Sequence, residues 1–245
     1  MTKKPEAGKV KNGGKKIMSK GLTEIVYILD RSGSMSGLEA DTIGGFNSMM
    51  DKQKKTGGKA LVSTVLFDDE CEVLHDRVPI DRIKKMTDKQ YYVRGCTALL
   101  DAVGGAIHHI ATIHKYARKE DRPEKTIFII TTDGMENASR KYSYSKVKKM
   151  IKHEQDRYGW EFIFIGANID AYAEADRFGI RRDRTANYVC DGMGTATVYA
   201  GVSKAVSAVM MADEDCDMDC CIMESGWNDE IDRDYEKRGA GKVRR

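Results

Sequence analysis

The sequence contains no long apolar run. No stretch of about 18 apolar residues occurs among its 245 residues, so neither a membrane-spanning helix nor a membrane partner is expected. The first twenty residues are charged and lack the apolar core of a secretory signal. The six cysteines lack the regular spacing of a disulfide framework, and we expect them to be reduced. Together these absences predict a cytoplasmic protein.

A large net charge is also missing, because the charges that are present gather at the two ends of the chain. The formal net charge is +3. Residues 1–20 contain seven lysines and one acid, which predicts a flexible lysine-rich arm over residues 1–21. Residues 213–236 contain eleven acids and one arginine, and the last nine residues are basic. We interpret residues 213–245 as an acidic, cysteine-containing and then basic tail, which leaves residues 22–212 as the folded domain.

Strand and helix patterns alternate along the middle of the chain. Apolar runs predict strands at 23–30, 60–69, 71–80, 125–133, 160–168 and 185–191. Helical patterns cover 38–56, 97–119, 143–159, 170–179 and 195–212. This alternation predicts an α/β fold with a doubly wound, mostly parallel sheet of about six strands and helices on both faces. The strand at 71–80 follows its predecessor so closely that we expect it to be an antiparallel edge strand.

Oxygen-bearing side chains lie at the ends of the predicted strands, where such sheets bind ligands. Asp30, Ser32 and Ser34 follow the first strand in "DRSGSM", Thr97 precedes a helix, and Asp133 ends the strand "KTIFIITTD". Each segment alone is most often a simple turn. Carboxylates and hydroxyls together suit a hard cation. The combination therefore favours a divalent-metal site, with Mg²⁺ as the first choice and Mn²⁺ or Ca²⁺ as alternatives.

With these residues in this order, the chain resembles a von Willebrand factor A (VWA) domain of the bacterial intracellular type. "DRSGSM", "GCTALLDA" and "TTDG" are similar to the three loops of the metal-ion-dependent adhesion site (MIDAS) of that family. The likeness covers about residues 22 to 210 and implies a Rossmann-like VWA fold. It also implies that the metal is held, directly or through water, by Asp30, Ser32, Ser34, Thr97 and Asp133. Cys96 is a departure, because many members have a second glycine there.

The resemblance implies a protein-interaction domain in which the metal accepts an acidic side chain from a partner protein. We expect this partner to supply Asp or Glu. Similar bacterial proteins act as adaptors, often for ATPases or for stress-response systems. The function expected from the resemblance is therefore that of a metal-dependent adaptor and not that of an enzyme.

Two alternatives from other classes remain open. A Mg²⁺-dependent phosphoester hydrolase needs a general base, and Glu136 is the only candidate close to the site in the sequence. Glu136 and its neighbour Asn137 are equally compatible with the rim of a site and with a solvated loop. Nucleic-acid contact through the basic ends lacks the interleaved aromatic and basic residues that support such binding.

The predicted tail leaves further alternatives open. Cys216, Cys220 and Cys221 lie among acids without a nearby histidine, which is compatible with a metal site, a redox pair or a reduced exposed tail. The acids of this segment could also take the vacant metal position within the same chain. Elsewhere, Asn168 ends a predicted strand and Asp170 lies just beyond it. Both could line the rim of the site or cap the next helix, and capping is the more common role for such residues.

Overall fold

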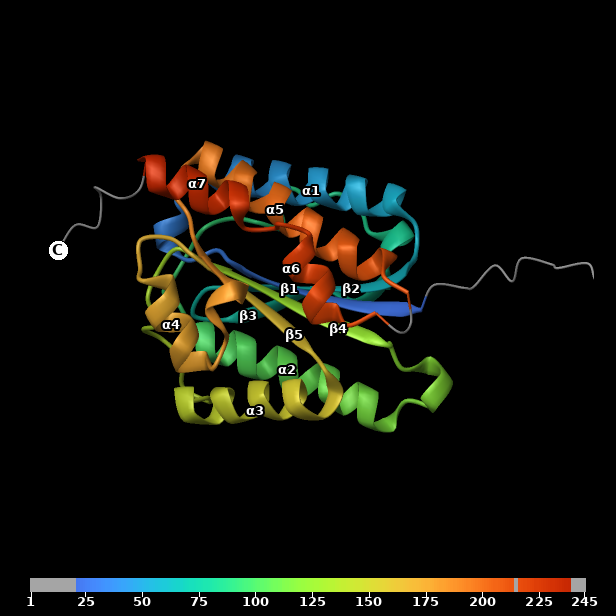
Figure 1. Ribbon diagram of the computed structural model, residues 1–245. Coiled ribbons are helices and arrows are strands. Elements are labelled where there is room, and N and C mark those ends of the chain that lie inside the picture. The colour runs from blue at the N-terminus through green and yellow to red at the C-terminus, as the bar shows by residue number, and fades with distance from the viewer. Residues whose placement is uncertain (1–20, 214–215, 239–245) are drawn as a thin grey trace, which may run out of the picture.

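A six-stranded sheet forms the centre of the computed structural model, which describes residues 21–213 and 216–238 (Figure 1). The strands are β1 (Leu22–Asp30), β2 (Lys59–Phe67), β3 (Cys71–Pro79), β4 (Lys125–Thr132), β5 (Glu161–Gly166) and β6 (Thr185–Asn187). Their order in the sheet is β3-β2-β1-β4-β5-β6. Only β3 runs antiparallel to its neighbour, and the other pairs are parallel. The predicted sheet with one antiparallel edge strand is confirmed.

Helices cover both faces of this sheet. They are α1 (Glu39–Thr56), α2 (Leu99–Tyr116), α3 (Tyr144–Tyr158), α4 (Ala171–Phe178), α5 (Gly192–Met211), α6 (Met218–Glu224) and α7 (Asp229–Arg238). Figure 1 shows α1, α5, α6 and α7 on one face and α2, α3 and α4 on the other. In the described part of the chain, no helix combines the length and the apolar character needed to cross a membrane.

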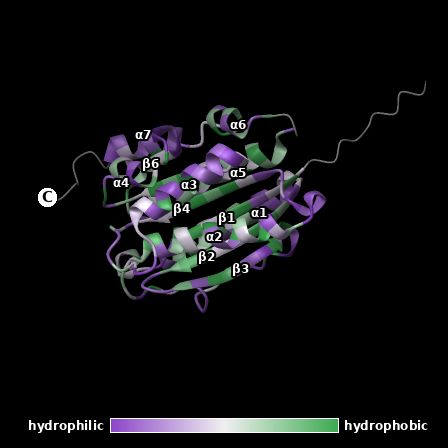
Figure 2. Cartoon of the chain, turned by 90° about the horizontal axis from the view of Figure 1, so that it is seen from below, coloured by the Kyte–Doolittle hydropathy of each residue, from purple (hydrophilic) through white to green (hydrophobic). Residues whose placement is uncertain are grey.

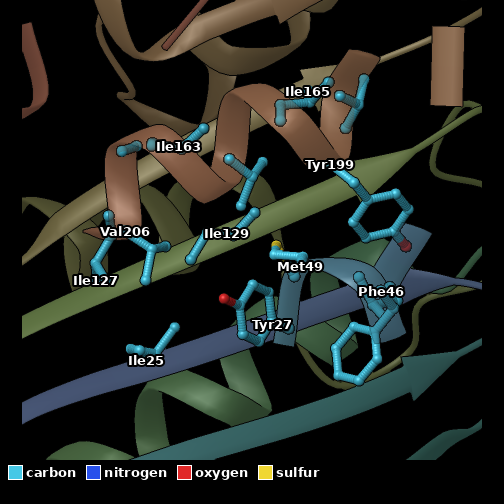
Figure 3. Packing of buried hydrophobic residues seen from close by; sticks show 14 of the residues in the cluster. Ile25, Tyr27, Phe46, Met49, Ile127, Ile129, Ile163, Ile165, Tyr199 and Val206 are labelled. Carbon is cyan, nitrogen blue, oxygen red and sulfur yellow. The ribbon is translucent and has the colours of Figure 1, made fainter. Parts of the chain in front are cut away.

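The central strand β1 explains why helices are needed on both faces. Successive side chains of a strand point to opposite sides of the sheet. Ile25 and Tyr27 therefore join the cluster under α1 and α5, whereas Val26 and Ile28 join the cluster under α2 and α3. Figure 3 shows Tyr27 beside Met49 and Phe46 of α1. Because both faces of β1 are apolar and fully buried, the polar side chains of this strand are found mainly at its ends.

The register of the two central strands positions the candidate site. In the parallel pair β1 and β4, Leu29 lies opposite Thr131. The next residues along each chain, Asp30 and Thr132, are therefore neighbours at the carboxyl edge of the sheet. Asp133 follows directly, so the two aspartates predicted as metal ligands leave adjacent strands at the same edge.

The expectation of an exposed tail is corrected for residues 216–238, which fold as α6 and α7. Ile222, Trp227 and Ile231 are each at most 1% exposed and belong to the same cluster as α5. The Trp227 indole donates to the carbonyl of Asp183 at 3.3 Å. Figure 2 shows α7 as mostly hydrophilic, which is why the acidic sequence was interpreted as a tail. The predicted arm over residues 1–20 and the basic end over 239–245 lie outside the described residues.

The last predicted strand is shorter than expected. β6 ends at Asn187, whereas the sequence pattern extended it to 191. Asp191 instead caps α5, because its side chain accepts a hydrogen bond from the Gly194 amide at 2.9 Å. The cap starts the helix three residues earlier than predicted.

Replacing Ile231, the buried side chain of α7, tests whether this helix contributes to the stability of the fold. Ile231→Ala should lower the free energy of unfolding by about 2 to 5 kcal/mol, because it leaves a cavity against Gly201 of α5. Urea denaturation measures this change. Glu236→Ala, at an exposed position of the same helix, should change stability by less than about 0.5 kcal/mol. Equal effects of the two substitutions would contradict the packing of α7 on α5.

Candidate metal centre

Asp30 is held rigidly at the end of β1. Its side chain is buried, with one carboxylate oxygen accepting from the Ser32 amide at 2.7 Å and the other from the Thr132 hydroxyl at 2.6 Å. The Tyr91 hydroxyl donates to its backbone carbonyl at 2.5 Å. These hydrogen bonds fix the direction of the carboxylate without neutralising its charge.

The chain after Asp30 curls back on itself as a short 3₁₀ turn, Gly33–Met35. The turn brings the hydroxyl oxygens of Ser32 and Ser34 to 3.1 Å from each other. The Ser34 hydroxyl also donates to Oδ1 of Asp133, which lies 99 residues further along the chain. The turn thus joins the β1 loop to the end of β4.

Hydrogen bonds attach the Thr97 loop both to this turn and to the loop after β4. The Gly33 amide donates to the Gly95 carbonyl at 3.2 Å, and the Thr97 amide donates to Oδ1 of Asn137 at 2.9 Å. Gly95 has φ +67, and a Cβ there would lie 1.8 Å from Oδ1 of Asp69, so glycine is required. Cys96 is exposed, so this loop accommodates its side chain without packing it against the fold.

Gly134 shows where the loops converge. A Cβ at this position would lie 3.3 Å from both Oγ of Ser34 and Oγ1 of Thr97. The two hydroxyls therefore face one small space beside Asp133. The structure brings all five predicted ligands to one edge of the sheet, and metal ligation by Asp30, Ser32, Ser34, Thr97 and Asp133 remains a prediction.

The two carboxylates of this edge, Asp30 and Asp133, are buried without a cation against them in the described part of the chain. Burial raises the pKa of Asp30. Burial, and after it the negative charge of Asp30, raises the pKa of Asp133 to about 6. Among residues 21–213 and 216–238, no lysine or arginine side chain forms an ion pair with either group. Two buried carboxylates and several hydroxyls around one space suit a bound hard cation.

The nearest arginine is directed away from the centre. Arg31 is fully buried and pairs with Asp68 at 2.7 Å and with Glu72 at 2.7 Å. Arg94 binds the same Asp68 oxygen at 2.8 Å. Asp68 thus connects the chain beside Asp30 to the loop that carries Thr97. This cluster orients the loops and leaves the charge of Asp30 uncompensated.

Glu136 and Asn137 have structural roles that the sequence left open. Both carboxylate oxygens of Glu136 accept hydrogen bonds, from the amides of Ala138, Ser139 and Leu100 and from the Ser139 hydroxyl, at 2.7 to 3.0 Å. Glu136 therefore fastens its loop to the start of α2. It is neither a free rim residue nor a general base poised over the site.

Residues after β5 and β6 complete the surroundings. Asp170 caps α4 through the Ala173 amide at 3.1 Å, as predicted, whereas Asn168 is exposed and has φ +57. Cys190 was missed by sequence reasoning. Its thiol donates to Oδ2 of Asp133 at 3.6 Å, and burial together with Asp133 raises the pKa of this thiol to about 12. Thr132 was also missed, although it stands next to Asp133 in "TTDG".

The cysteines and acids of the C-terminal segment lie elsewhere. The sulfur atoms of Cys216 and Cys221 are in hydrogen-bond contact, but within the described ranges no three His, Cys, Asp or Glu side chains cluster as a metal site. Asp219 pairs with Arg181 and Arg184. For residues 216–238, no interaction connects an acidic side chain to the five predicted ligands, so occupation of the metal position by these acids is not seen.

Comparison with known protein structures identifies which fold this chain resembles. No family model and no curated protein matches the chain. Among solved structures, the vWF domain of the pilus tip protein Mfa5 from Porphyromonas gingivalis is 11% identical with a TM-score of 0.57, over 81% of this chain and 99% of that one. The von Willebrand factor type A protein from Catenulispora acidiphila is 14% identical with a TM-score of 0.52, over 78% of this chain and 43% of that one.

A third similar structure is proximal thread matrix protein 1 of the mussel byssus, described with a zinc-occupied MIDAS motif. It is 16% identical with a TM-score of 0.53, and the match covers 77% of this chain and 46% of that one. This chain therefore spans less than half of the byssus protein that it matches. At these identities the likeness establishes the architecture alone: the chain has the Rossmann-like α/β fold of VWA domains.

Proposed function

We propose that this chain is a metal-dependent protein-interaction domain of the adaptor type. Asp30, Ser32, Ser34, Thr97 and Asp133 hold Mg²⁺, directly or through water, and an acidic side chain of a partner protein completes the coordination. The observation that carries the proposal is the pair of buried carboxylates that share one space with hydroxyls and form no ion pair with any Lys or Arg of the described residues. Bound Mg²⁺ would supply the positive charge that draws in the partner's carboxylate.

The centre is accessible from solvent on one side. Asp30, Ser32, Thr97 and Asp133 are buried, and so is Met35 within the turn, but Gly33, Ser34, Ser36 and Gly37 are exposed. Met135, two residues after Asp133, is 64% exposed. A partner's side chain can therefore reach the metal over the 33–37 turn without opening the fold.

Within residues 21–213 and 216–238, the two side chains considered as a base for the hydrolase alternative are engaged elsewhere. Both oxygens of Glu136 are already engaged at the start of α2. His75 lies on β3, where its ring contacts the Thr64 hydroxyl and stacks on Phe46. Since neither Glu136 nor His75 is placed to act as a general base in the described part of the chain, interaction is favoured over phosphoester hydrolysis.

The partner class follows from the family resemblance alone. An ATPase or a stress-response system remains the proposed context, in the cytoplasm. The nucleic-acid alternative depends on residues 1–20 and 239–245, which lie outside the described residues. Binding to nucleic acid that weakens steeply with salt, and that is lost without residues 1–20, would favour that alternative.

The raised pKa of Asp133 allows a test of whether this carboxylate binds a cation. Its folded-state pKa of about 6 exceeds the ordinary value of 3.8, so the folded protein holds this proton more tightly. In EDTA the group's stabilising contribution is present near pH 4 and lost as the pH rises through 6. Asp133→Asn should therefore be more stable than the wild type in EDTA at pH 7, with the advantage shrinking toward pH 4.

Urea denaturation at both pH values with and without Mg²⁺ measures this. Mg²⁺ at 100 times its Kd should stabilise the wild type by about 2.7 kcal/mol and leave Asp133→Asn nearly unchanged. Equal stabilisation of both proteins by Mg²⁺ would show that Asp133 holds no metal.

Partner capture tests the interaction itself. Immobilised protein should retain a partner from its native lysate in Mg²⁺ and release it in EDTA. Asp30→Ala should abolish retention, because the centre loses a charged ligand, while its circular dichroism spectrum stays that of a folded protein. Asp41→Ala, in the first turn of α1, is the matched control and should retain the partner. Retention by folded Asp30→Ala, or equal retention in EDTA, would count against the proposal.

A further inference from the structure

Cys190 introduces a sulfur atom into a centre whose other donors are oxygens. It lies between the end of β6 and the capping residue Asp191, and its side chain is partly buried. Its thiol contacts Oδ2 of Asp133, while the Ser34 hydroxyl contacts Oδ1 of the same carboxylate. One oxygen of Asp133 therefore faces the Ser34 hydroxyl, and the other faces the Cys190 thiol. The sequence motif includes the residues on the hydroxyl side but not Cys190.

The spacing of the thiol and the carboxylate matches that of two ligands on one zinc ion. Zinc binds carboxylate oxygen at about 2.1 Å and thiolate sulfur at about 2.3 Å, with roughly tetrahedral angles. Two such ligands are about 3.6 Å apart by this geometry. The observed separation of Cys190 Sγ and Asp133 Oδ2 is 3.6 Å. A zinc ion could therefore be bound by both groups with little movement of either side chain.

We propose that Cys190 is an additional ligand that adapts this metal centre to Zn²⁺ and similar borderline-soft divalent cations. The proposal rests on the metal centre proposed above and concerns which ion it prefers. When Zn²⁺ binds, the Cys190 thiol gives its proton to water and a zinc–sulfur bond forms, so no oxidant or reductant is involved. Asp133 supplies a second ligand, and hydroxyls or water complete the set.

A thiol in this place affects different metals unequally. Mg²⁺ takes oxygen ligands and gains nothing from sulfur, whereas thiolate favours zinc. A simpler role for Cys190 is to orient Asp133 by donating a hydrogen bond. Serine distinguishes the two roles, because its hydroxyl still donates a hydrogen bond but is a poor ligand for a soft ion. Cys190→Ser should therefore lose zinc affinity and keep magnesium affinity.

Cobalt provides the direct readout, since a cobalt–thiolate bond absorbs in the near ultraviolet. The experiment uses the full chain with Cys216, Cys220 and Cys221 replaced by serine, so that those thiols do not contribute. Co²⁺ titration should produce a charge-transfer band that saturates at one ion per chain. The band should disappear in Cys190→Ser and persist in Cys96→Ser, the control at an exposed cysteine beside Thr97.

Affinities complete the test. Zn²⁺ competition against Co²⁺ should show at least about tenfold weaker zinc binding in Cys190→Ser, with the Mg²⁺ affinity changed by less than about twofold. A missing cobalt band, or one that survives Cys190→Ser, would overturn the role of Cys190. If Mg²⁺ binding still required Asp30 in that case, the proposed interaction domain would stand. If neither Mg²⁺ nor Zn²⁺ bound, both proposals would fail together.

Discussion

The burial of two carboxylates at the ends of neighbouring parallel strands is the constraint around which this edge of the molecule is organised. Asp30 and Asp133 are at most 2% exposed. Burying a charge is costly unless it is paired. The structure gives these groups hydrogen bonds from Ser32, Ser34 and Thr132 instead of a cation. Each bond favours the ionised form, and none removes the repulsion between the two groups. A bound divalent ion is the direct way to satisfy both.

The chain does contain a buried cation next to Asp30 in the sequence, but its guanidinium pairs with other carboxylates and leaves the charge of Asp30 unpaired. Arg31 is withdrawn to Asp68 and Glu72, and Arg94 shares the Asp68 carboxylate. Breaking such a buried pair is strongly destabilising, because it leaves an uncompensated charge. Pairing Arg31 with Asp30 would require breaking its ion pair with Asp68, which is energetically costly. The same cluster connects the loop after β2 to the Thr97 loop, so charge separation and loop positioning come from one set of contacts.

The sequence predicted the features that depend on short-range patterns. Apolar periodicity located the strands, and the oxygen-bearing residues at the strand ends, Asp30 and Asp133 among them, pointed to one edge of the sheet. It missed features that depend on distant contacts. Cys190 meets Asp133 only because β6 pairs with β5 and β5 with β4. The segment 216–238 is mostly acidic, and its burial depends on a few anchors such as Trp227 and Ile231, whose partner surface on α5 has no local signature. Glu136 likewise needed the start of α2 to reveal its role.

The C-terminal helix also reaches the edge that carries the metal centre. Arg238 at the end of α7 binds Oδ2 of Asp191 at 2.6 Å, and Asp191 follows Cys190 directly. Both side chains of this pair are partly exposed, so the pair itself adds little stability. Its consequence is positional, because it places the end of α7 beside the residue that caps α5. The buried side chains of Trp227 and Ile231 hold this segment on the domain, and Arg238 then pairs with Asp191. Residues interpreted from sequence as a tail are therefore part of the framework around the thiol side of Asp133.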